Sequence, residues 1–502
     1  MSPPVSLLAL AVLPVVYFAI VATYRLFFHP LSKIPGPKLL AITSLPKDIK
    51  NNILGTWYKD VAAIHAQYGR VVRMSPDSVA IDGDPGWDDA YAFRKKGEED
   101  FKRDPNWFHV DDGKTASLPS IFLTDREGHR RQRRVLAHAF SQTAMYEQEP
   151  TIKHFVDLFI TRLRSLSEAG TPLDIVKWYF NFATFDIIGE LTFGESFECL
   201  DKSQMHPWIS MIFQSVQAAE YLRFLLAYPL TAVITKRLIG KRVFETRKDQ
   251  RDFTIAKTDR RLAQGVAGSG KKDFMSYVLK HNDEKGMTRE EIWGNSESLI
   301  GAGSETTATA LSGLMYYLGK NPQVMQILLS EIRTAFDSEE AITMRSSAAL
   351  VYTHACIEEA LRVFPPVPVT PVRLSPGDFV GGHYLPKDTK IVVHQWATYR
   401  NPENWHRPND FCPERFLPQD HPFYNAAFAH DNKKCFRPFA YGPTECLGKN
   451  LAYAEMRLIM AKFLWNFDAT GLPENEDWAE KMTGNTLWDK RPLMVKLSLA
   501  KH

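Results

Sequence analysis

The stretch Phe439-Ala-Tyr-Gly442-Pro-Thr-Glu-Cys446-Leu-Gly448 sets one cysteine between two glycines, directly before a strongly helical segment that extends to about Trp465. Backbone N–H groups at the start of a helix stabilise a thiolate through direct hydrogen bonds and the helix dipole. Glycines let the backbone approach a neighbouring group closely. We therefore expect Cys446 to be a functional thiolate, rather than the inert buried thiol that a free cysteine usually is.

The other four cysteines have no such frame. Cys199, Cys356 and Cys412 fit the buried, inert thiols of a protein core, and Cys435, the rival candidate, lacks the glycine spacing. Five scattered cysteines without a Cys-x-x-Cys pair exclude a disulfide scaffold and argue against a cysteine-rich zinc module.

The composition is that of a large globular protein. The chain has 502 residues, of which 44% are hydrophobic and 24% charged, and this length is enough to bury a large core. The formal net charge is only +3. So small an excess argues against a dedicated nucleic-acid binder, whose basic residues would cluster, and we expect no nucleic-acid partner.

The N-terminal segment from Met1 to Tyr24 carries no charged side chain. A run of about 20 apolar residues can cross about 30 Å of hydrocarbon, so residues 1–24 predict a single membrane-spanning anchor. A cleaved signal peptide is the alternative, but the segment lacks a basic start and a small-residue cleavage site before Arg25. The basic residues that follow the span place the body in the cytosol, by the positive-inside rule.

A proline-rich linker is predicted at residues 25–40. Its Ile34-Pro-Gly-Pro37 sequence combines stiff prolines with a glycine that permits a sharp turn, which is typical of a rigid elbow. We expect this elbow to set the angle between the anchor and one large body at residues 41–502.

The body is predicted to be mainly α-helical, with a smaller β-rich lobe near the anchor. Apolar residues at three-to-four spacing predict mostly helix from about 125 to 335. Thr288-x-x-Glu291 is a capping box that opens a helix to about Gly319, nearly 50 Å long. The other predicted elements are a hairpin at Val71–Ile81, strands at Phe379–Tyr384 and Lys390–His394, an irregular proline-rich stretch at about 400–440 and a helix at about Leu447–Trp465.

Three more motifs precede the cysteine stretch in a fixed order. They are Ala302-Gly-Ser-Glu305-Thr306-Thr307 in the long helix, Glu359-Ala-Leu-Arg362, and Phe411-Cys-Pro-Glu-Arg415-Phe416. Together with the anchor and the elbow, the four motifs resemble the cytochrome P-450 family of haem-thiolate monooxygenases. The segments Phe28–Leu31, His129–Ser141 and Phe185–Gly194 resemble filamentous-fungal members that act in secondary metabolism.

The resemblance implies a single haem-enclosing domain on the endoplasmic reticulum membrane. Its cofactor would be haem b with Cys446 as the axial thiolate, and its partners O₂, an NADPH-dependent flavoprotein reductase and a lipophilic small molecule. By position in the family motif, Glu305 and Thr306 would be the acid and alcohol of a catalytic proton relay. A threonine can also bond back to the carbonyl one turn earlier, and Thr307 is the better candidate for that role.

The resemblance also assigns the residues around the haem. Phe439, Gly442 and Gly448 would frame the thiolate, and His129, Arg133 and Arg373 would bind the propionates. The sequence departs from the family at His129, which replaces a tryptophan, and at Thr444, which stands where an arginine is usual. The second change removes one charge-assisted hydrogen bond, which typically contributes about 1.5–3 kcal/mol, so we expect a weaker hold on the haem.

Two further roles follow from the family pattern. Glu359 and Arg362 lie one helical turn apart, and with Arg415 they would form a buried structural network behind the thiolate loop. Basic side chains near the cysteine would dock the acidic reductase; they are Arg130, Arg131, Arg133, Arg134, Lys433 and Lys434.

Two alternatives remain open at this point. A haem-binding sensor or carrier would need no proton relay, and a thiol hydrolase based on Cys446 would need a histidine partner that the motif does not supply. The substrate itself is not readable from the sequence. Expected wall positions are the loop at about 108–122, Ala302, Val367–Val372 and Thr486–Trp488, which are mostly apolar.

Overall fold

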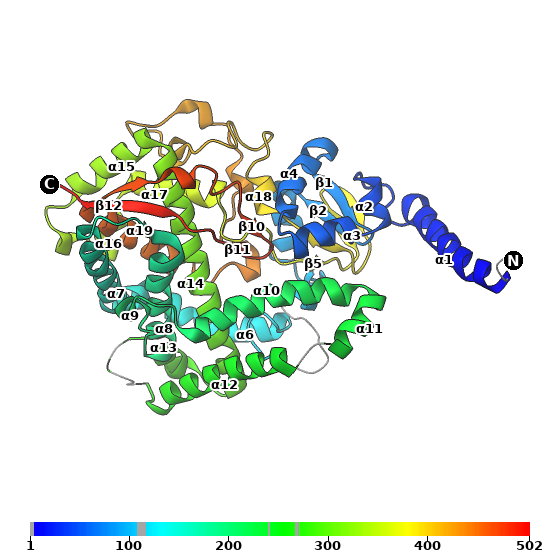
Figure 1. The fold of residues 1–502 in the computed structure, drawn as a ribbon, viewed down its shortest axis with the longest axis horizontal. Coiled ribbons are helices and arrows are strands. Elements are labelled where there is room, and N and C mark those ends of the chain that lie inside the picture. The colour runs from blue at the N-terminus through cyan, green and yellow to red at the C-terminus, as the bar shows by residue number, and fades with distance from the viewer. Residues whose placement is uncertain (1–4, 108–116, 239–240, 267–269, 271, 502) are drawn as a thin grey trace.

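The computed structural model describes residues 5–107, 117–238, 241–266, 270 and 272–501. It shows a mainly helical body, with the N-terminal residues and a small sheet forming a lobe at one side (Figure 1). The predicted fold class is confirmed in this respect. The part of the wall loop at 108–116 lies outside the described residues.

The longest helix, α14 (Arg289–Lys320), runs through the middle of the helical body (Figure 1). Its capping box forms as predicted, because the Glu291 N–H donates to Thr288 Oγ1 at 3.3 Å and the Thr288 N–H donates back to Glu291 Oε2 at 2.9 Å. The predicted start and length of this helix are confirmed. Because α14 is so long, the turn at Ala302 can face a site while the turns from Thr307 to Ser312 are buried in the core.

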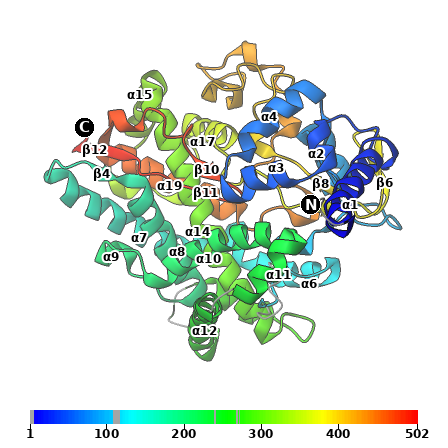
Figure 2. The same cartoon turned by 45° about the vertical axis from the view of Figure 1, so that its right-hand side comes forward.

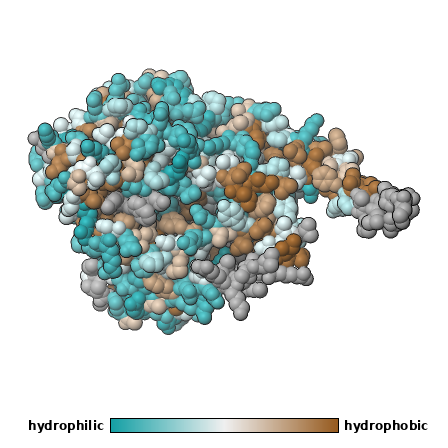
Figure 3. All heavy atoms as spheres, in the orientation of Figure 1, coloured by the Kyte–Doolittle hydropathy of each residue, from teal (hydrophilic) through white to brown (hydrophobic). Residues whose placement is uncertain are grey.

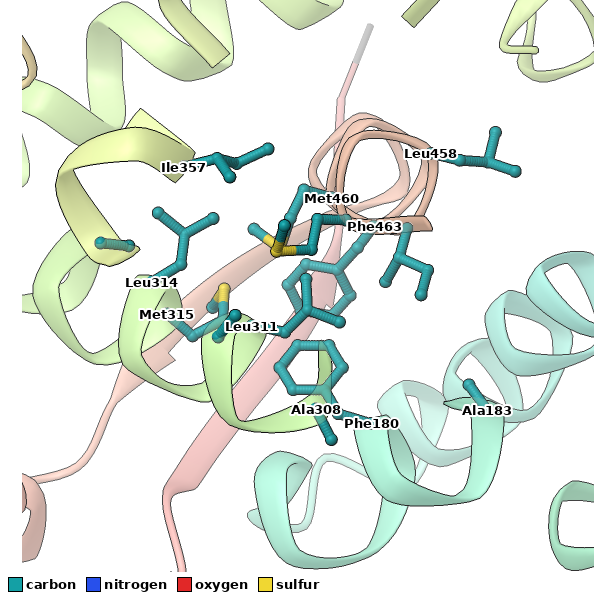
Figure 4. Close-up of a cluster of buried hydrophobic side chains, with 14 of the residues drawn as sticks. Phe180, Ala183, Ala308, Leu311, Leu314, Met315, Ile357, Leu458, Met460 and Phe463 are labelled. Carbon is teal, nitrogen blue, oxygen red and sulfur yellow. The ribbon is translucent and has the colours of Figure 1, made fainter. Parts of the chain in front are cut away.

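The core is built on four helices that contact one another. They are α14, α8 (Asn181–Phe193), α17 (Val351–Val363) and α19 (Lys449–Asn466). Figure 4 shows Leu311 and Met315 of α14 beside Met460 and Phe463 of α19. Burying each such side chain contributes about 1.5–3 kcal/mol, so these helices hold the chain around Cys446 and the polar motif of α14 in place.

The lobe contains a five-stranded sheet in the order β1-β2-β8-β5-β3. The strands are β1 (Val71–Ser75), β2 (Ser78–Ile81), β8 (Lys390–Val392), β5 (Arg373–Leu374) and β3 (Lys102–Arg103). The predicted hairpin is confirmed as the antiparallel pair β1–β2. The short strands β3 and β5 are antiparallel neighbours, and this register sets Arg103 directly opposite Arg373.

One predicted strand is wrong in its extent. Residues 379–384 form a hairpin of two strands, β6 (Asp378–Val380) and β7 (His383–Leu385), and not one strand. Gly381 and Gly382 stand between them with φ values of 56° and 79°. These left-handed conformations reverse the chain between the apolar pair Phe379–Val380 and Tyr384.

The remaining helices and strands are the following. The longer helices are α1 (Val5–Thr23), α4 (Trp57–Tyr68), α6 (Arg126–Leu136), α7 (Gln142–Glu168), α10 (Pro207–Ala227), α11 (Pro229–Leu238), α12 (Lys241–Ala263), α13 (Phe274–His281) and α15 (Pro322–Ala335). Short helices are α2 (Lys38–Ile42), α3 (Leu45–Asp48), α5 (Gly83–Gly86), α9 (Cys199–Lys202), α16 (Met344–Ser347) and α18 (Gln395–Thr398). The other strands are β4 (Leu173–Asp174), β9 (Phe467–Gly471), β10 (Thr483–Gly484), β11 (Trp488–Asp489) and β12 (Met494–Leu499).

Helix α1 extends away from the lobe in Figure 1 and comes toward the viewer at the side of the lobe in Figure 2. Among the described residues, no helix combines the length and the apolar character that a membrane span requires. The anchor expected at residues 1–24 is therefore not confirmed.

The segment expected as a linker packs against the sheet. Leu31 and Ile34 are buried among core side chains of the lobe, and the Arg73 N–H donates to the Pro35 carbonyl at 2.8 Å. A Cβ on Gly36 would lie 2.4 Å from the Arg73 oxygen, so only glycine fits this close approach. The elbow is thus held rigid by contact with β1 as well as by its prolines.

Candidate active site

Cys446 lies three residues before the start of α19, whose N-cap is Gly448. Its own N–H donates to the Phe439 carbonyl at 2.8 Å, which closes the loop that carries the thiol. Cys446 is exposed, whereas the other four cysteines are buried. Since burial nevertheless raises the pKa of the Cys446 thiol, its exposed surface faces an internal hollow and not bulk water. The Gly448 N–H and Arg133 act in the opposite direction and lower that pKa.

The two glycines of the loop, Gly442 and Gly448, have different surroundings. Gly442 has a φ of 73°, and a Cβ there would lie 2.2 Å from the Tyr91 carbonyl oxygen. Its need for glycine therefore comes from the neighbouring chain, not from the approach of a ligand. A Cβ on Gly448 would meet only Cys446 Sγ at 3.9 Å and Phe140 Cε1 at 4.0 Å, so the space beside Gly448 is open.

The other sequence-predicted residues of the loop surround the thiol. The Phe439 ring packs against Tyr453 at a centroid distance of 4.9 Å. On α6, Arg133 Nη1 donates to the Glu445 carbonyl at 2.6 Å. From β5, Arg373 Nη2 donates to Thr444 Oγ1 at 2.6 Å. The structure thus brings Arg133 and Arg373 to the two residues that precede Cys446.

A third arginine, which the sequence reasoning missed, joins this group. Arg103 lies opposite Arg373 across β3 and β5, and its Nη1 donates to the Ile121 carbonyl at 2.8 Å. Burial, together with the charges of Arg373 and Arg133, lowers the pKa of Arg103 to about 9. Nothing local in the sequence marks this residue, because its partner on the neighbouring strand is 270 positions away along the chain.

His129 completes the cluster one helical turn before Arg133. It is buried, and burial together with Arg103, Arg133 and Arg373 lowers the pKa of its imidazole to about 4. The ring is therefore neutral near pH 7 and donates through a single N–H. Within the described ranges, the three arginines make no ion pair with a carboxylate. Asp100, whose charge acts on Arg373, is itself paired with Arg126.

The polar motif of α14 opens a gap in an otherwise buried helix. Ala302 is exposed and Thr306 is half-buried, while the residues from Thr307 to Ser312 are buried. A Cβ on Gly301 would meet nothing within 4 Å, whereas one on Gly303 would lie 2.7 Å from Ile188 Cδ1 of α8. The open side of the helix therefore lies at Gly301 and Ala302, and Gly303 serves the packing of α8.

Both threonines of the motif bond back to the helix. Thr306 Oγ1 donates to the Ala302 carbonyl at 2.7 Å, and Thr307 Oγ1 donates to the Gly303 carbonyl at 3.2 Å. The expectation that Thr307 has this role is confirmed, but Thr306 shares it. Glu455 of α19 hydrogen-bonds the Thr307 side chain, and burial raises the pKa of this acid to about 8. This contact joins the polar motif to the helix that begins after Cys446.

Glu305 points to a lysine that the sequence reasoning also missed. Lys490 Nζ donates to Glu305 Oε1 at 2.6 Å and to Thr309 Oγ1 at 3.2 Å. Both side chains are at most 5% exposed. Burial raises the pKa of Glu305, while Lys490 lowers it. The second carboxylate oxygen, Oε2, is buried without a hydrogen bond, so it remains available for a polar partner.

Glu359, Arg362 and Arg415 are fully buried and contact one another. Arg362 makes two bonds of 2.7 Å to the Glu359 carboxylate, and Arg415 Nε lies 3.0 Å from its Oε2. Arg362 also donates to the carbonyls of Tyr399 and Pro408. These bonds join α17 to the irregular chain at 399–415, which leads to the thiolate loop.

A separate cavity of about 590 Å³ lies between the β-lobe and α10. Its lining includes Val369, Val372 and Thr486, which are among the expected substrate-wall positions. Glu220 of α10 bonds Asn52 and Arg223 beside it. The cavity therefore has polar groups from the lobe and α10 and apolar groups from the chain before β5.

The arrangement fits a haem group. An internal hollow beside a thiol at a helix start, together with arginines that have no ion-pair partner among the described residues, suits a flat ligand that accepts a thiolate and carries carboxylates. The fold and the site thus define a helical haem-thiolate protein.

Comparison with known proteins gives the family. Residues 36–497 match the family described as Cytochrome P450. A cytochrome P450 monooxygenase, lcsI, of Purpureocillium lilacinum is 41% identical over 97% of this chain and 92% of its own length. A trichothecene C-4 hydroxylase of Trichoderma arundinaceum is 39% identical over 94% and 93% of the two chains. A trichothecene C-15 hydroxylase of Fusarium sporotrichioides is 37% identical over 96% of each.

The chain belongs to the cytochrome P450 family. It is therefore a monooxygenase-family enzyme that uses haem iron with a cysteine thiolate ligand, O₂ and electrons from a redox partner.

Proposed function

We propose that this enzyme is a membrane-associated monooxygenase of fungal secondary metabolism that oxidises a lipophilic small molecule, with hydroxylation as its first expected outcome. The observation that carries the proposal is the exposed Cys446 thiol inside the protein, beside arginines without an ion-pair partner in the described part of the chain. The names of two relatives, both trichothecene hydroxylases, support hydroxylation as the reaction.

The residues around Cys446 divide the work of holding the cofactor. Cys446 would ligate the haem iron, and the Gly448 N–H stabilises its thiolate form. Arg133, Arg373 and the neutral His129 would donate to the carboxylates of the haem. When bound, the haem supplies the chemistry of dioxygen activation, which a thiolate ligand favours. Phe439 and Gly442 keep the loop closed beneath it.

Glu305 and Thr306 would move protons toward the open side of α14. Lys490 holds the Glu305 carboxylate at 2.6 Å, and the unpartnered Oε2 is the atom that takes up a proton. The Thr306 hydroxyl lies on the helix at the edge of the hollow and can exchange its bond to the Ala302 carbonyl for one to a water or substrate group. In this arrangement Lys490 positions the acid and does not itself react.

The redox partner is proposed to be an NADPH-dependent flavoprotein reductase, with electrostatic steering toward the cysteine side. Lys433, Lys434 and Arg130 are exposed there. Arg131 and Arg134 are already paired with Glu291 and Asp283. The unpaired lysines are therefore the better docking contacts.

Membrane association is supported by the surface near the N-terminus. Leu13, Val15 and Tyr17 on α1 are each more than half exposed. Figure 3 shows apolar surface continuing onto the lobe beside α1, where Leu39 and Leu54 are also more than half exposed. We propose that α1 anchors the enzyme in the endoplasmic reticulum membrane with the body facing the cytosol.

A reduced-CO difference spectrum of the purified enzyme tests the core of the proposal. A Soret band at the thiolate position is expected, and folded, haem-loaded protein without it would contradict the assignment of Cys446. Incubation with a reductase and a panel of terpenoids then separates an enzyme from a haem carrier, because only an enzyme forms product with NADPH consumption.

A further inference from the structure

We propose that the cavity between the β-lobe and α10 binds the hydroxyl-bearing end of a neutral lipophilic substrate, and that His394 selects this substrate by a hydrogen bond to the hydroxyl group. The inference rests on the monooxygenase function proposed above, and it names the class of substrate. His394 lies outside the four sequence motifs and outside the wall positions expected from the sequence.

The cavity has the size and the place of a substrate site. Its volume is about 590 Å³, within the range of about 300–1,000 Å³ that is usual for small-molecule sites. Val372, which lines the cavity, directly precedes Arg373, and Arg373 Nη2 donates to Thr444 Oγ1 in the cysteine loop. One wall of the cavity is thus formed by the chain that contacts the cysteine loop.

The charged side chains that line the cavity leave no cation free for a ligand. Three ion pairs account for the two lysines and the arginine of the lining: Lys390–Asp77 at 2.9 Å, Lys47–Asp48 at 3.5 Å and Arg223–Glu220 at 2.6 Å. The fourth carboxylate of the lining, Asp104, accepts two hydrogen bonds from Asn106. Four carboxylates against three cations give a small negative excess, which disfavours an anionic ligand.

His394 is a buried polar group without a partner among the described residues. It lines the cavity and is 7% exposed, yet neither ring nitrogen makes a hydrogen bond within the described part of the chain. Burial, together with the charges of His65 and Lys47, lowers the pKa of this imidazole to about 3. The ring is therefore neutral near pH 7. Because buried polar groups are almost always satisfied, it indicates a hydrogen-bonding group that a ligand supplies.

A hydroxyl group matches the neutral imidazole of His394 in both directions. The ring has one donor and one acceptor, and a hydroxyl can accept from the first or donate to the second. A carboxylate can only accept, and it would also meet the negative excess of the lining. An ammonium can only donate, and it would have to compete for Asp104, whose Oδ1 already accepts both bonds from Asn106. A neutral alcohol is therefore the best match.

The rest of the ligand is expected to be apolar. Side chains from α4, β1, β8 and the chain before β5 line the same cavity; they are Trp57, Met74, Val392, Val369 and Val372. Apolar walls of this kind contribute binding energy, while a few polar groups fix the orientation of the ligand. The cavity thus suits an alcohol on a hydrophobic ring system better than a plain hydrocarbon.

The test measures the binding of four probes to the purified holoenzyme by isothermal titration calorimetry. Abietadiene, abietadienol, abietic acid and dehydroabietylamine share one carbon skeleton and carry a methyl, hydroxyl, carboxylate and ammonium group in turn. The alcohol is expected to bind most tightly. His394→Phe keeps a ring but removes its hydrogen bonds, so it should weaken binding of the alcohol by about three- to tenfold and leave the hydrocarbon unchanged.

Two further variants check the place of the site. His383→Phe is the matched control, because His383 lies in β7 of the same lobe and is not among the residues that line the cavity; it should change no affinity. Asn485→Trp replaces a half-buried lining residue by a bulky one, and it should weaken binding of the alcohol and the hydrocarbon alike.

Three results would overturn the inference. They are equal affinity for the four probes or tightest binding of the acid or the amine, an alcohol affinity that His394→Phe leaves unchanged, and full affinity in Asn485→Trp. Failure of the proposed function has a different signature, namely no thiolate Soret band or no product, since calorimetry detects binding whether or not the enzyme turns over.

Discussion

The buried pair Glu305–Lys490 gives a stability prediction whose sign depends on pH. Both side chains are at most 5% exposed and their charged atoms are 2.6 Å apart. Replacing Lys490 by methionine keeps the apolar stem but leaves the Glu305 carboxylate without its partner. Breaking a buried ion pair in this way costs about 3–5 kcal/mol, so Lys490→Met should lower the free energy of unfolding by about that amount near pH 8.

The loss should be smaller at pH 5. Burial already raises the pKa of Glu305, and Lys490 is the first group that opposes this rise. Without the lysine, the pKa in the folded state rises further above its unfolded value. Stability from such a group is present at low pH and is lost as the pH rises through the folded pKa. At pH 5 the acid can therefore bind a proton and avoid the cost of a buried charge.

The assay is denaturant unfolding of the haem-loaded enzyme at pH 5 and pH 8. Glu305→Gln in the Lys490→Met background should recover most of the loss at pH 8, because it removes the unpaired charge. Lys481→Met is the control, since Lys481 pairs with Asp477 on the surface and should change stability by less than about 1 kcal/mol. An equal loss at both pH values, with no recovery by Glu305→Gln, would refute this account of the pair.

Three further predictions concern the loop, the network and the docking surface. Gly442→Ala should lower the free energy of unfolding by more than about 2 kcal/mol, because φ is 73° and the new Cβ would overlap the neighbouring chain. Gly382→Ala is its control, because φ is 79° there but a Cβ would meet nothing within 4 Å. This control should lower the free energy of unfolding by about 1 kcal/mol. Glu359→Gln should lose about 3–5 kcal/mol and much of its haem, since two buried arginines lose their carboxylate; normal haem content after purification would contradict the structural role. Charge reversal at Lys433 and Lys434 should slow turnover driven by the reductase while sparing turnover driven by peroxide, and equal losses in the two assays would exclude docking there.

The cysteine loop shows which features of the site can be predicted from the local sequence. The spacing of Gly442, Cys446 and Gly448 is enough to predict a thiol at a helix start, because each of these effects acts over a few residues. The reason for Gly442 was not predictable, since the Tyr91 carbonyl that excludes a side chain comes from a segment 351 positions earlier. The structure thus gives a reason for glycine at 442 that the local sequence does not contain.

The hairpin at Gly381–Gly382 shows a different limit. One strand was predicted across residues 379–384, and two adjacent glycines in left-handed conformations divide it into two. The glycines permit a reversal, but their presence alone does not show that the chain reverses there.

The sequence by itself determined the helical class, the long capped helix α14 and the place of Cys446 ahead of a helix, because capping, periodicity and the spacing of glycines are local properties. Only the tertiary structure decided that Arg103 stands beside Arg373 and that Lys490 holds Glu305. Both pairs join segments that are far apart along the chain, and their register follows from strand pairing and helix packing. Charge clusters of this kind arise when the core closes, so no short stretch of sequence contains them.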